Sequence, residues 1–422
     1  MLKVFYSENI DALKQKGLHW ADSFSTACFF DSNQYADPYS AFDLFIAAGI
    51  KKELIHSVND SIKELEAFLS ENRSYVLGYF AYDLKNEAEN LSSNNPDHLK
   101  FPDFHFFLPE HSILIKGNEV QIESDQADEI WRLINEFEVS NIKSSAQKNQ
   151  IQSRFSREEY LETVIEIQKH IQRGDIYEIN FCQEFYAENT SINPIEIFSK
   201  LNKLSPTPFA SYYKSDGRYI LSASPERFLS RRGSKIISQP IKGTSSRKSD
   251  LIQDEKQKKS LLENEKERSE NVMIVDLVRN DLTKSAKEGT VKVEELFGLY
   301  SFKQVHQMIS TVVCEAKKDL SNAQIISNTF PMGSMTGAPK ISAMQIAEKY
   351  ERSKRGVYSG ALGYFAPNGD FDFNVVIRTI LYNENSKYLS FQVGSAITLD
   401  SNPEMEYEEC ILKGKAITEV LS

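Results

Sequence analysis

A lysine and a glutamate flank a predicted β-hairpin in the second half of the chain, and together they could perform covalent and acid–base chemistry. The glutamate lies in Ser224-Pro225-Glu226-Arg227, and the lysine lies in Gln239-Pro240-Ile241-Lys242-Gly243-Thr244. The β-rich runs 219–222 and 235–238 are expected to form the arms, with a turn at residues 231–234. This turn places Glu226 and Lys242 at one end of the ribbon, and on one face unless a bulge intervenes. A surface ion pair is the simpler explanation of the two residues taken alone.

Two predicted helices in the same half carry carboxylates on one side. Glu267 and Glu270 are three positions apart, and Glu406, Glu409 and Lys413 continue at spacings that also share a helix face. Mg²⁺ prefers oxygen ligands, keeps several waters and is often completed by an anionic group of the substrate. Two such helices facing each other could hold Mg²⁺, although the spacing alone is more typical of solvated acidic faces.

Other residues could bind an anion. Arg378 ends an apolar run and could clamp a carboxylate through two hydrogen bonds, and Tyr358 could donate another. The small residues of Gly394-Ser395-Ala396 would let backbone N–H groups approach an anion closely. Ser334 lies in a tight loop that opens a helix, and it could face a bound ring; the spacing of a Walker phosphate loop is absent.

These residues need a framework of alternating strands and helices. Ser156 and Glu159 form a capping box that starts a helix, and Gly174 is suited to end it. A strand is expected over 177–185, and segment 86–109 is expected to be an irregular surface excursion. Further helices are expected at 263–282, 322–328, 339–350 and 405–420. The polar segment 140–153 is the best domain boundary, dividing an N-terminal subdomain (1–145) from a catalytic domain (150–422).

Bulk properties restrict the class of protein. The chain has 422 residues, 41% hydrophobic, and a net charge of −11, which argues against a nucleic-acid partner. It lacks both a stretch of ~20 apolar residues that could span a membrane and the apolar core of a signal peptide. The four cysteines are scattered without metal spacing, so they are expected to be reduced core residues of a cytoplasmic protein.

Six ordered motifs identify a resemblance. They are Ser224-Pro225-Glu226-Arg227-Phe228, Pro240-Ile241-Lys242-Gly243-Thr244, Met273-Ile274-Val275-Asp276-Leu277-Val278-Arg279-Asn280-Asp281, Thr336-Gly337-Ala338-Pro339-Lys340, Arg355-Gly356-Val357-Tyr358-Ser359-Gly360-Ala361-Leu362-Gly363-Tyr364, and Ile377-Arg378. The chain resembles the chorismate-utilising family, which includes anthranilate synthase component I, aminodeoxychorismate synthase component I, isochorismate synthases and salicylate synthases. The resemblance is dense over residues 150–420 and weaker at 77–84. It implies an α+β fold like that of anthranilate synthase component I: two packed, mostly antiparallel β-sheets flanked by helices, with both sequence halves contributing.

The resemblance also implies roles for the candidate residues. Glu270 and Glu409 match the carboxylates that bind Mg²⁺, with Glu267 and Glu406 supporting them and Lys413 balancing charge; Mn²⁺ would accept the same oxygen ligands. The residues expected to bind chorismate are Arg378, Tyr358, Ser334, Thr244, Gly394, Ser395, Ala396 and Lys413. The family often has glycine where Ala396 stands.

Lys242 distinguishes the branches of the family. Anthranilate and isochorismate synthases typically have alanine there, whereas the aminodeoxychorismate branch uses a lysine as a nucleophile on the chorismate ring. Glu178 aligns with the lysine that activates water in isochorismate and salicylate synthases. A nucleophilic lysine must be neutral, so we expect burial or a nearby cation to lower the pKa of Lys242. Glu226 is the expected acid.

The resemblance therefore implies an aminodeoxychorismate synthase component I, a transferase-type activity that converts chorismate and ammonia to 4-amino-4-deoxychorismate for p-aminobenzoate and folate synthesis. The alternative is anthranilate synthase component I. A non-catalytic binding protein would be expected to have lost Arg378 or the metal carboxylates, and both are present.

Ammonia is expected from a separate glutamine amidotransferase subunit, or as free ammonia, because no cysteine lies in a nucleophile elbow. Two features depart from the pattern. Gln307 stands where many relatives have histidine, and the neighbouring His306 would point to the opposite face of a strand. Phe29-Phe30-Asp31-Ser32 partly matches a strand associated with feedback by tryptophan, so the N-terminal subdomain could hold an occupied or vestigial amino-acid pocket.

Overall fold

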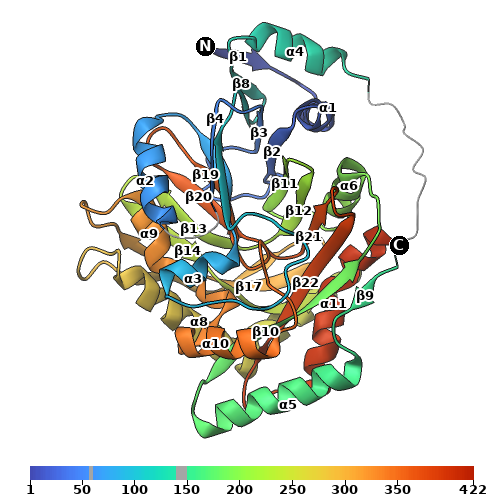
Figure 1. The fold of residues 1–422 in the computed structure, drawn as a ribbon, viewed down its shortest axis with the longest axis vertical. Helices are drawn as coiled ribbons and strands as arrows, with labels where there is room; N and C mark the ends of the chain where they lie inside the picture. The colour runs from blue at the N-terminus through green and yellow to red at the C-terminus, as the bar shows by residue number, and fades with distance from the viewer. Residues whose placement is uncertain (57–59, 139–149) are drawn as a thin grey trace.

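Two β-sheets dominate the computed structural model, which describes residues 1–56, 60–138 and 150–422 (Figure 1). The first has twelve strands, in the order β1 (Leu2–Tyr6), β8 (Glu119–Glu123), β7 (His111–Lys116), β3 (Leu44–Ala48), β2 (Thr26–Asp31), β11 (Phe209–Ser215), β12 (Arg218–Ser224), β21 (Thr379–Asn383), β22 (Tyr388–Ile397), β10 (Glu178–Ala187) and β18 (Gly337–Ala338), with β9 (Gln152–Ser153) also on β10. The second has ten strands, in the order β15 (Ile241–Ser246), β17 (Val305–Glu315), β14 (Lys235–Gln239), β13 (Arg227–Arg232), β20 (Phe371–Val375), β19 (Ala361–Phe365), β5 (Val76–Phe80), β6 (Phe104–Leu108) and β4 (Lys52–His56), with β16 (Lys292–Ser301) also on β17. The expected α+β fold with antiparallel sheets is confirmed.

Each sheet is built from both sequence halves. In the first sheet, β2 pairs with β11, so that Phe30 lies opposite Ser211. In the second, β5 pairs with β19, so that Phe80 lies opposite Ala361. The expected boundary falls largely on residues 139–149, outside the described residues, and the division into two domains stays a prediction.

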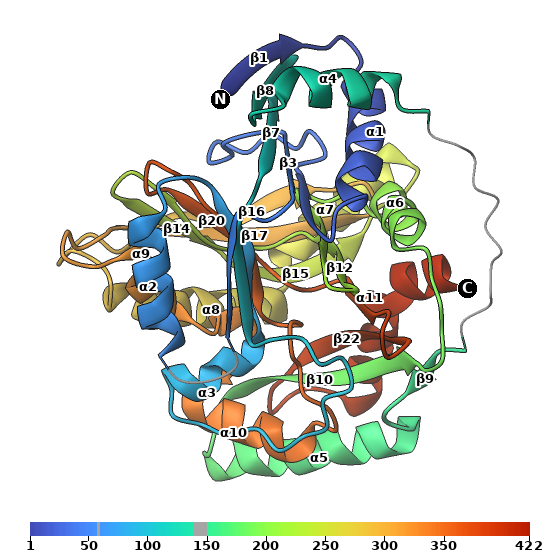
Figure 2. The same ribbon diagram turned by 45° about the horizontal axis from the view of Figure 1, so that its top comes forward.

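Helices cover the outer faces of the sheets (Figure 2). Helices α8 and α9 lie against the second sheet, while α5, α10 and α11 pack around the β10–β22 end of the first. The bounds are α1 (Ile10–Asp22), α2 (Ser61–Glu71), α3 (Lys85–Ala88), α4 (Ala127–Glu136), α5 (Arg157–Arg173), α6 (Pro194–Leu204), α7 (Leu251–Glu263), α8 (Glu265–Thr283), α9 (Asn322–Thr329), α10 (Lys340–Tyr350) and α11 (Pro403–Leu421), with 3₁₀ turns η1 (Tyr82–Leu84) and η2 (Gly333–Met335).

The start of α5 follows the expected local chemistry. The Ser156 side chain accepts a hydrogen bond from the backbone N–H of Glu159, the Glu159 side chain caps the backbone N–H of Ser156, and Gly174 ends the helix in the left-handed region at φ 84°. This confirms the capping box and the glycine stop.

The predicted hairpin is correct in its turn and wrong in one arm. Its arms are β13 and β14, and Gly233 supplies the turn with a φ of 60°. Residues 219–222 instead belong to β12 of the first sheet, between β11 and β21. The chain crosses between the sheets at Pro225 and Glu226, and proline fixes φ and lacks the N–H that would continue β12.

Segment 86–109 is not wholly irregular, because residues 104–108 form the buried strand β6. Phe104 and Phe106 are fully buried, and their rings pack against Phe80 in the core beside the second sheet. Apolar residues at consecutive as well as alternate positions, here on both sides of the buried His105, are typical of a strand covered on both faces.

Candidate active site

Three charged side chains meet where the two sheets adjoin. Lys242 on β15 of the second sheet forms an ion pair with Glu178, the first residue of β10 in the first sheet, with 2.9 Å between Nζ and Oε1. Glu226 lies at the crossover from β12 to β13, and its charge also acts on Lys242. The structure thus brings together Lys242 and Glu226, as expected, and adds Glu178.

The expected lowering of the Lys242 pKa is wrong for the charges that surround this side chain. Burial acts to lower the pKa, but the negative charges of Glu178, Glu270 and Glu226 outweigh it, and the pKa of Lys242 is raised above its ordinary value. Lys242 is therefore an ammonium held by carboxylates, and it must lose a proton before it can act as a nucleophile.

Glu226 has the character of an acid. Its side chain is 4% exposed, and this burial raises its pKa to about 7, against the opposing effects of a hydrogen bond from Ser334 and the charges of Lys242 and Arg378. A carboxyl group with that pKa is partly protonated near neutral pH and can donate its proton to a departing hydroxyl group.

The loop around η2 positions Ser334, whose side chain is buried, and its contact with a substrate stays a prediction. Arg355 donates to the Met335 carbonyl oxygen at 2.6 Å, and Lys340 donates to the Pro331 carbonyl oxygen at 2.9 Å. Arg355 is itself ion-paired with Glu351 at 2.7 Å. These two supporting cations were not singled out from the sequence, although both lie in the family motifs.

Arg378 is a half-buried cation with no hydrogen bond or ion pair from its guanidinium to any residue in the described ranges. Its backbone adopts a φ of 51°, and its carbonyl oxygen accepts a hydrogen bond from the N–H of Ala223. Burial lowers its pKa and the Glu226 charge opposes this. Such a group is free to bind an anion. Tyr358 is buried beside Cys182, whose Sγ lies 3.9 Å from its hydroxyl, and a shared role with Arg378 stays a prediction.

Helices α8 and α11 bring the acidic residues near each other. Lys266 lies between them, with its Nζ 3.7 Å from Glu270 Oε1 and 3.4 Å from Glu406 Oε1. Burial raises the pKa of Glu270 to about 7, and it also raises that of Glu267, on which the Glu409 charge acts in the same direction. Within the described ranges, no three His, Cys, Asp or Glu side chains are grouped closely enough to hold a metal ion together.

The acidic residues nevertheless fit Mg²⁺ in their chemistry. One or two carboxylates are sufficient protein ligands for this ion, because it keeps several waters. Burial raises the pKa of Glu270, so a bound cation would favour its charged form, whereas at Glu409 the charge of Lys413 outweighs burial and the pKa is lowered. Glu270 and Glu409 would hold the ion, with Glu267 and Glu406 nearby.

The small residues 394–396, which are expected to bind an anion through their backbone N–H groups, lie on β22 beyond the part that pairs with β21. Lys413 donates to the Gly394 carbonyl oxygen at 2.8 Å and pairs with Glu409 at 2.7 Å, and its charge-balancing role at a metal stays a prediction. The Ser395 hydroxyl lies 3.2 Å from the Tyr160 hydroxyl, so its side chain is directed to the α5 side. Ala396 is buried on the same strand. Binding by their backbone N–H groups stays a prediction.

Thr244 and Gln307 lie opposite each other on β15 and β17. Thr244 is exposed, whereas Gln307 is buried and its Oε1 has no hydrogen-bond partner in the part of the chain that the structure describes. His306 is turned to α7, where its Nε2 lies 3.0 Å from Asp254 Oδ1. His306 therefore cannot replace Gln307, as its strand position predicted.

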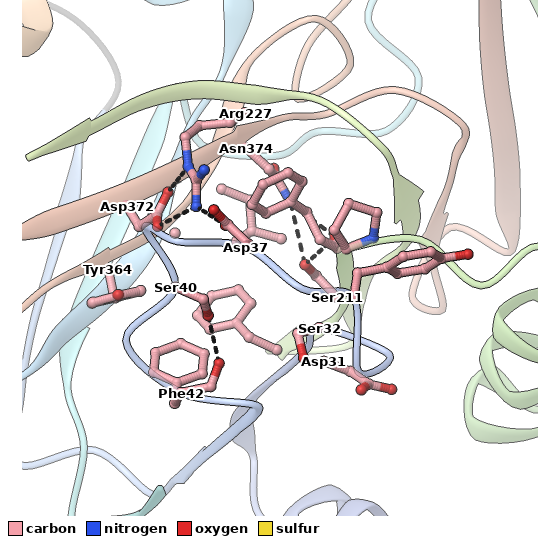
Figure 3. A pocket seen from close by; sticks show the side chains of 16 residues that line it. Asp31, Ser32, Asp37, Ser40, Phe42, Ser211, Arg227, Tyr364, Asp372 and Asn374 are labelled. Atoms are coloured by element: carbon pink, nitrogen blue, oxygen red, sulfur yellow. Dashed lines mark hydrogen bonds and ion pairs between the residues drawn. The ribbon is translucent and has the colours of Figure 1, made fainter. Parts of the chain in front are cut away.

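A small cavity of about 50 Å³ lies next to the Phe-Phe-Asp-Ser strand (Figure 3). Arg227 borders it and is fully engaged, with ion pairs to Asp372 at 2.9 Å and to Asp37 at 2.6 Å. Asp31 is paired with Lys14 and accepts a hydrogen bond from Asn202. The charged groups that could hold an amino acid are thus already paired within the protein, and an amino-acid pocket stays a prediction.

A family model described as chorismate binding enzyme matches residues 16–419. The chain belongs to this family. Curated relatives come from two of its branches. Aminodeoxychorismate synthase component 1 of Escherichia coli is 32% identical over 92% of this chain and 91% of its own length. Anthranilate synthase component 1 of Acetivibrio thermocellus is 32% identical over 82% of this chain and 74% of its own length.

Solved structures of the family share the fold. Anthranilate synthase component I of Streptococcus pneumoniae superposes with a TM-score of 0.79 at 24% identity, covering 91% of this chain and 93% of that one. The menaquinone-specific isochorismate synthase of Escherichia coli gives 0.78 at 16% identity, covering 100% and 95%. These similarities establish the fold. They do not identify the reaction, which depends on the residues of the site.

Two further expectations concern the whole chain. No helix in the described ranges is both long and apolar enough to cross a bilayer. All four cysteines are buried and unpaired, as expected for core residues.

Proposed function

We propose that this chorismate-binding enzyme is component I of an aminodeoxychorismate synthase, which converts chorismate and ammonia to 4-amino-4-deoxychorismate. The observation that carries the proposal is the buried Lys242, paired with Glu178 and next to the acid Glu226. In the family resemblance, a lysine at this position marks the aminodeoxychorismate branch, whereas the anthranilate branch typically has alanine.

Each of the candidate residues has a separate role in the proposed reaction. Arg378 binds the enolpyruvyl carboxylate through its guanidinium, helped by Tyr358, and Ser334 and Thr244 border the ring. Lys242 attacks the ring, and the 4-hydroxyl group leaves as water with the proton of Glu226. Ammonia then adds at the 4-position and Lys242 is expelled.

Mg²⁺ belongs in the same proposal. Glu270 and Glu409 would hold the ion, which would supply positive charge for binding the ring carboxylate and for withdrawing electron density from the ring. The ammonium of Lys413 balances the carboxylates through its pair with Glu409.

Ammonia would come from a glutamine amidotransferase subunit. A glutaminase needs a reactive cysteine thiolate, but the four thiols are buried, and burial raises the pKa of each of them. The product would serve p-aminobenzoate and folate synthesis.

Anthranilate synthesis is the second candidate, because relatives of that branch match the chain at the same identity. Product analysis separates the two. Purified protein is incubated with chorismate, Mg²⁺ and ammonium, and the products of wild type, Lys242→Ala and Lys235→Ala are separated by mass. Lys235 is a matched control because it is a lysine of the same sheet, on β14, that pairs with Glu294 at 2.7 Å, and β17 separates its strand from that of Lys242.

We expect wild type and Lys235→Ala to accumulate 4-amino-4-deoxychorismate, and Lys242→Ala to lose at least about 100-fold in rate. Anthranilate from the wild type would move the protein to the other branch. Full activity of Lys242→Ala would remove the lysine from the mechanism.

A further inference from the structure

Glu178 is the residue that holds the Lys242 side chain in place. The pair joins the two sheets, and the side chains are 12% and 6% exposed for Lys242 and Glu178. Hydrogen bonds between oppositely charged groups are short and strong, and they are less screened where water is excluded. The direction of the Lys242 amine is therefore set by the position of one carboxylate.

The backbone of Glu178 is fixed by strand β18. A Cβ on Gly337 would lie 2.2 Å from the Glu178 carbonyl oxygen, so the close contact of the two strands requires glycine there. Gly337 also has a φ of 152°, in the region that favours glycine. The N–H of Tyr177 donates to the Ala338 carbonyl oxygen at 2.7 Å. Little freedom is left at the base of the Glu178 side chain.

The neighbouring carboxylates are engaged elsewhere. Glu226 accepts a hydrogen bond from Ser334, and Glu270 faces Lys266. Glu409 is paired with Lys413. Glu267 also faces this region from α8, but among the described residues the Lys242 Nζ has its one hydrogen bond with Glu178.

We propose that Glu178 is the positioning residue for Lys242, and that its carboxylate orients the amine and takes its proton as the amine attacks the substrate. The proposal rests on the proposed function for the identity of the substrate. The first step transfers one proton from the Lys242 ammonium to Glu178 and leaves a neutral amine and a neutral acid.

The remaining steps balance. The amine lone pair forms the N–C bond, the C–O bond to the hydroxyl group breaks, and the oxygen takes the Glu226 proton and leaves as water. Ammonia then forms the C–N bond at the 4-position, and the electron pair of the Lys242–carbon bond returns to Lys242. The new ammonium gives a proton to Glu226, and Glu178 returns its proton to Lys242. The net reaction replaces the hydroxyl group of the substrate with an amino group and releases one water.

The first test measures the covalent adduct. Wild type, Glu178→Gln, Glu178→Asp and Glu184→Gln are mixed with chorismate and Mg²⁺ without ammonia, and intact-protein mass spectrometry follows the mass of chorismate less water. Glu184 is a matched control, because it is equally buried on β10 and ion-paired with Arg154 at 2.8 Å. We expect Glu178→Gln to form the adduct about 100-fold more slowly or worse, Glu178→Asp to recover part of the rate, and Glu184→Gln to stay within a few-fold of wild type.

Comparing KM with kcat shows whether Glu178→Gln loses the orientation of Lys242 or disrupts the substrate site as a whole. The KM of Glu178→Gln should stay within about threefold of wild type while kcat falls, because the lost interaction acts on the nucleophile. Wild-type adduct formation by Glu178→Gln would overturn the proposal, as would a loss explained by weaker chorismate binding.

The second test needs no chorismate. Lys242 is labelled with acetic anhydride across a pH series, and the labelled peptide is counted by mass spectrometry. The midpoint of labelling should move down by about one pH unit or more in Glu178→Gln and stay unchanged in Glu184→Gln. If this shift occurs but the wild-type product is anthranilate, the proposed function fails while the pairing stands. If aminodeoxychorismate is made and neither assay responds to Glu178→Gln, the positioning role alone fails.

Discussion

At the scale of single residues, the site combines groups that are costly to keep charged. Glu226 is the clearest case, since burial raises its pKa to about 7 from an ordinary value of 4.5. The folded protein then binds a proton that the unfolded chain has already lost between these pH values. The free energy of unfolding therefore falls as pH rises through this window, by about 3 kcal/mol at about 1.4 kcal/mol per pH unit.

Replacing Glu226 by glutamine removes this ionisation. We expect Glu226→Gln to lose most of its activity, and its stability relative to wild type to increase by about 2–3 kcal/mol between pH 5 and pH 8. Urea unfolding at the two pH values measures the difference. If the difference in free energy of unfolding between variant and wild type is the same at both pH values, the ionisation of Glu226 does not destabilise the folded protein.

Residue-level chemistry was partly predictable from the sequence. The motifs placed Lys242 and Glu226 together, and the structure agrees. The Glu178 pair was not predicted, because β10 and β15 belong to different sheets and only tertiary packing brings them together. The raised pKa of Lys242 follows from the same packing, because three carboxylates outweigh burial.

At the scale of elements, α8 and α11 form an acidic pair that a lysine already bridges. Lys266 lies within 3.7 Å of Glu270 and 3.4 Å of Glu406, and its side chain is 52% exposed. A divalent ion bound to these carboxylates must compete with the ammonium, which can turn out to solvent.

We expect Lys266→Met to bind Mg²⁺ several-fold more tightly than wild type, because the competing cation is gone. The same variant should unfold at a lower temperature without metal, because buried carboxylates then repel each other without compensation. Isothermal titration and metal-free thermal unfolding measure the two effects. Lys259→Met is the control, since that exposed lysine pairs with Glu263 on α7 at 3.8 Å. Unchanged or weaker Mg²⁺ binding by Lys266→Met would contradict the competition.

Local signals predicted individual elements better than their partners. The capping box and Gly174 gave α5 its bounds, because both act within a few residues. The arm at 219–222 was misassigned because its β pattern does not reveal which sheet it joins. Strand β6 was missed because His105 interrupts its apolar residues and because polar residues and prolines surround it.

At the scale of the whole molecule, the N-terminal segment completes both sheets. Removing residues 1–145 would uncover β11 where β2 pairs and β19 where β5 pairs. Exposed apolar strand edges promote aggregation.

We therefore expect a chain of residues 150–422 to show no cooperative thermal unfolding and to aggregate when expressed alone. Co-expression of 1–145 as a separate chain should restore a soluble complex, which size-exclusion chromatography with circular dichroism can detect. A monomeric 150–422 fragment with a cooperative transition would show instead that the catalytic half folds on its own.

The pairing of β5 with β19 also sets the order in which this protein can mature on the ribosome. Residue 80 must wait for residue 361 to be synthesised before its strand has a neighbour on that side. During this time the apolar strand β5 and the phenylalanine-rich strand β6 are complete but uncovered. Contacts between distant parts of a chain form slowly, and transiently exposed apolar strands bind one another or chaperones. Slower translation before residue 361 should therefore lengthen the vulnerable interval and lower the yield of folded protein.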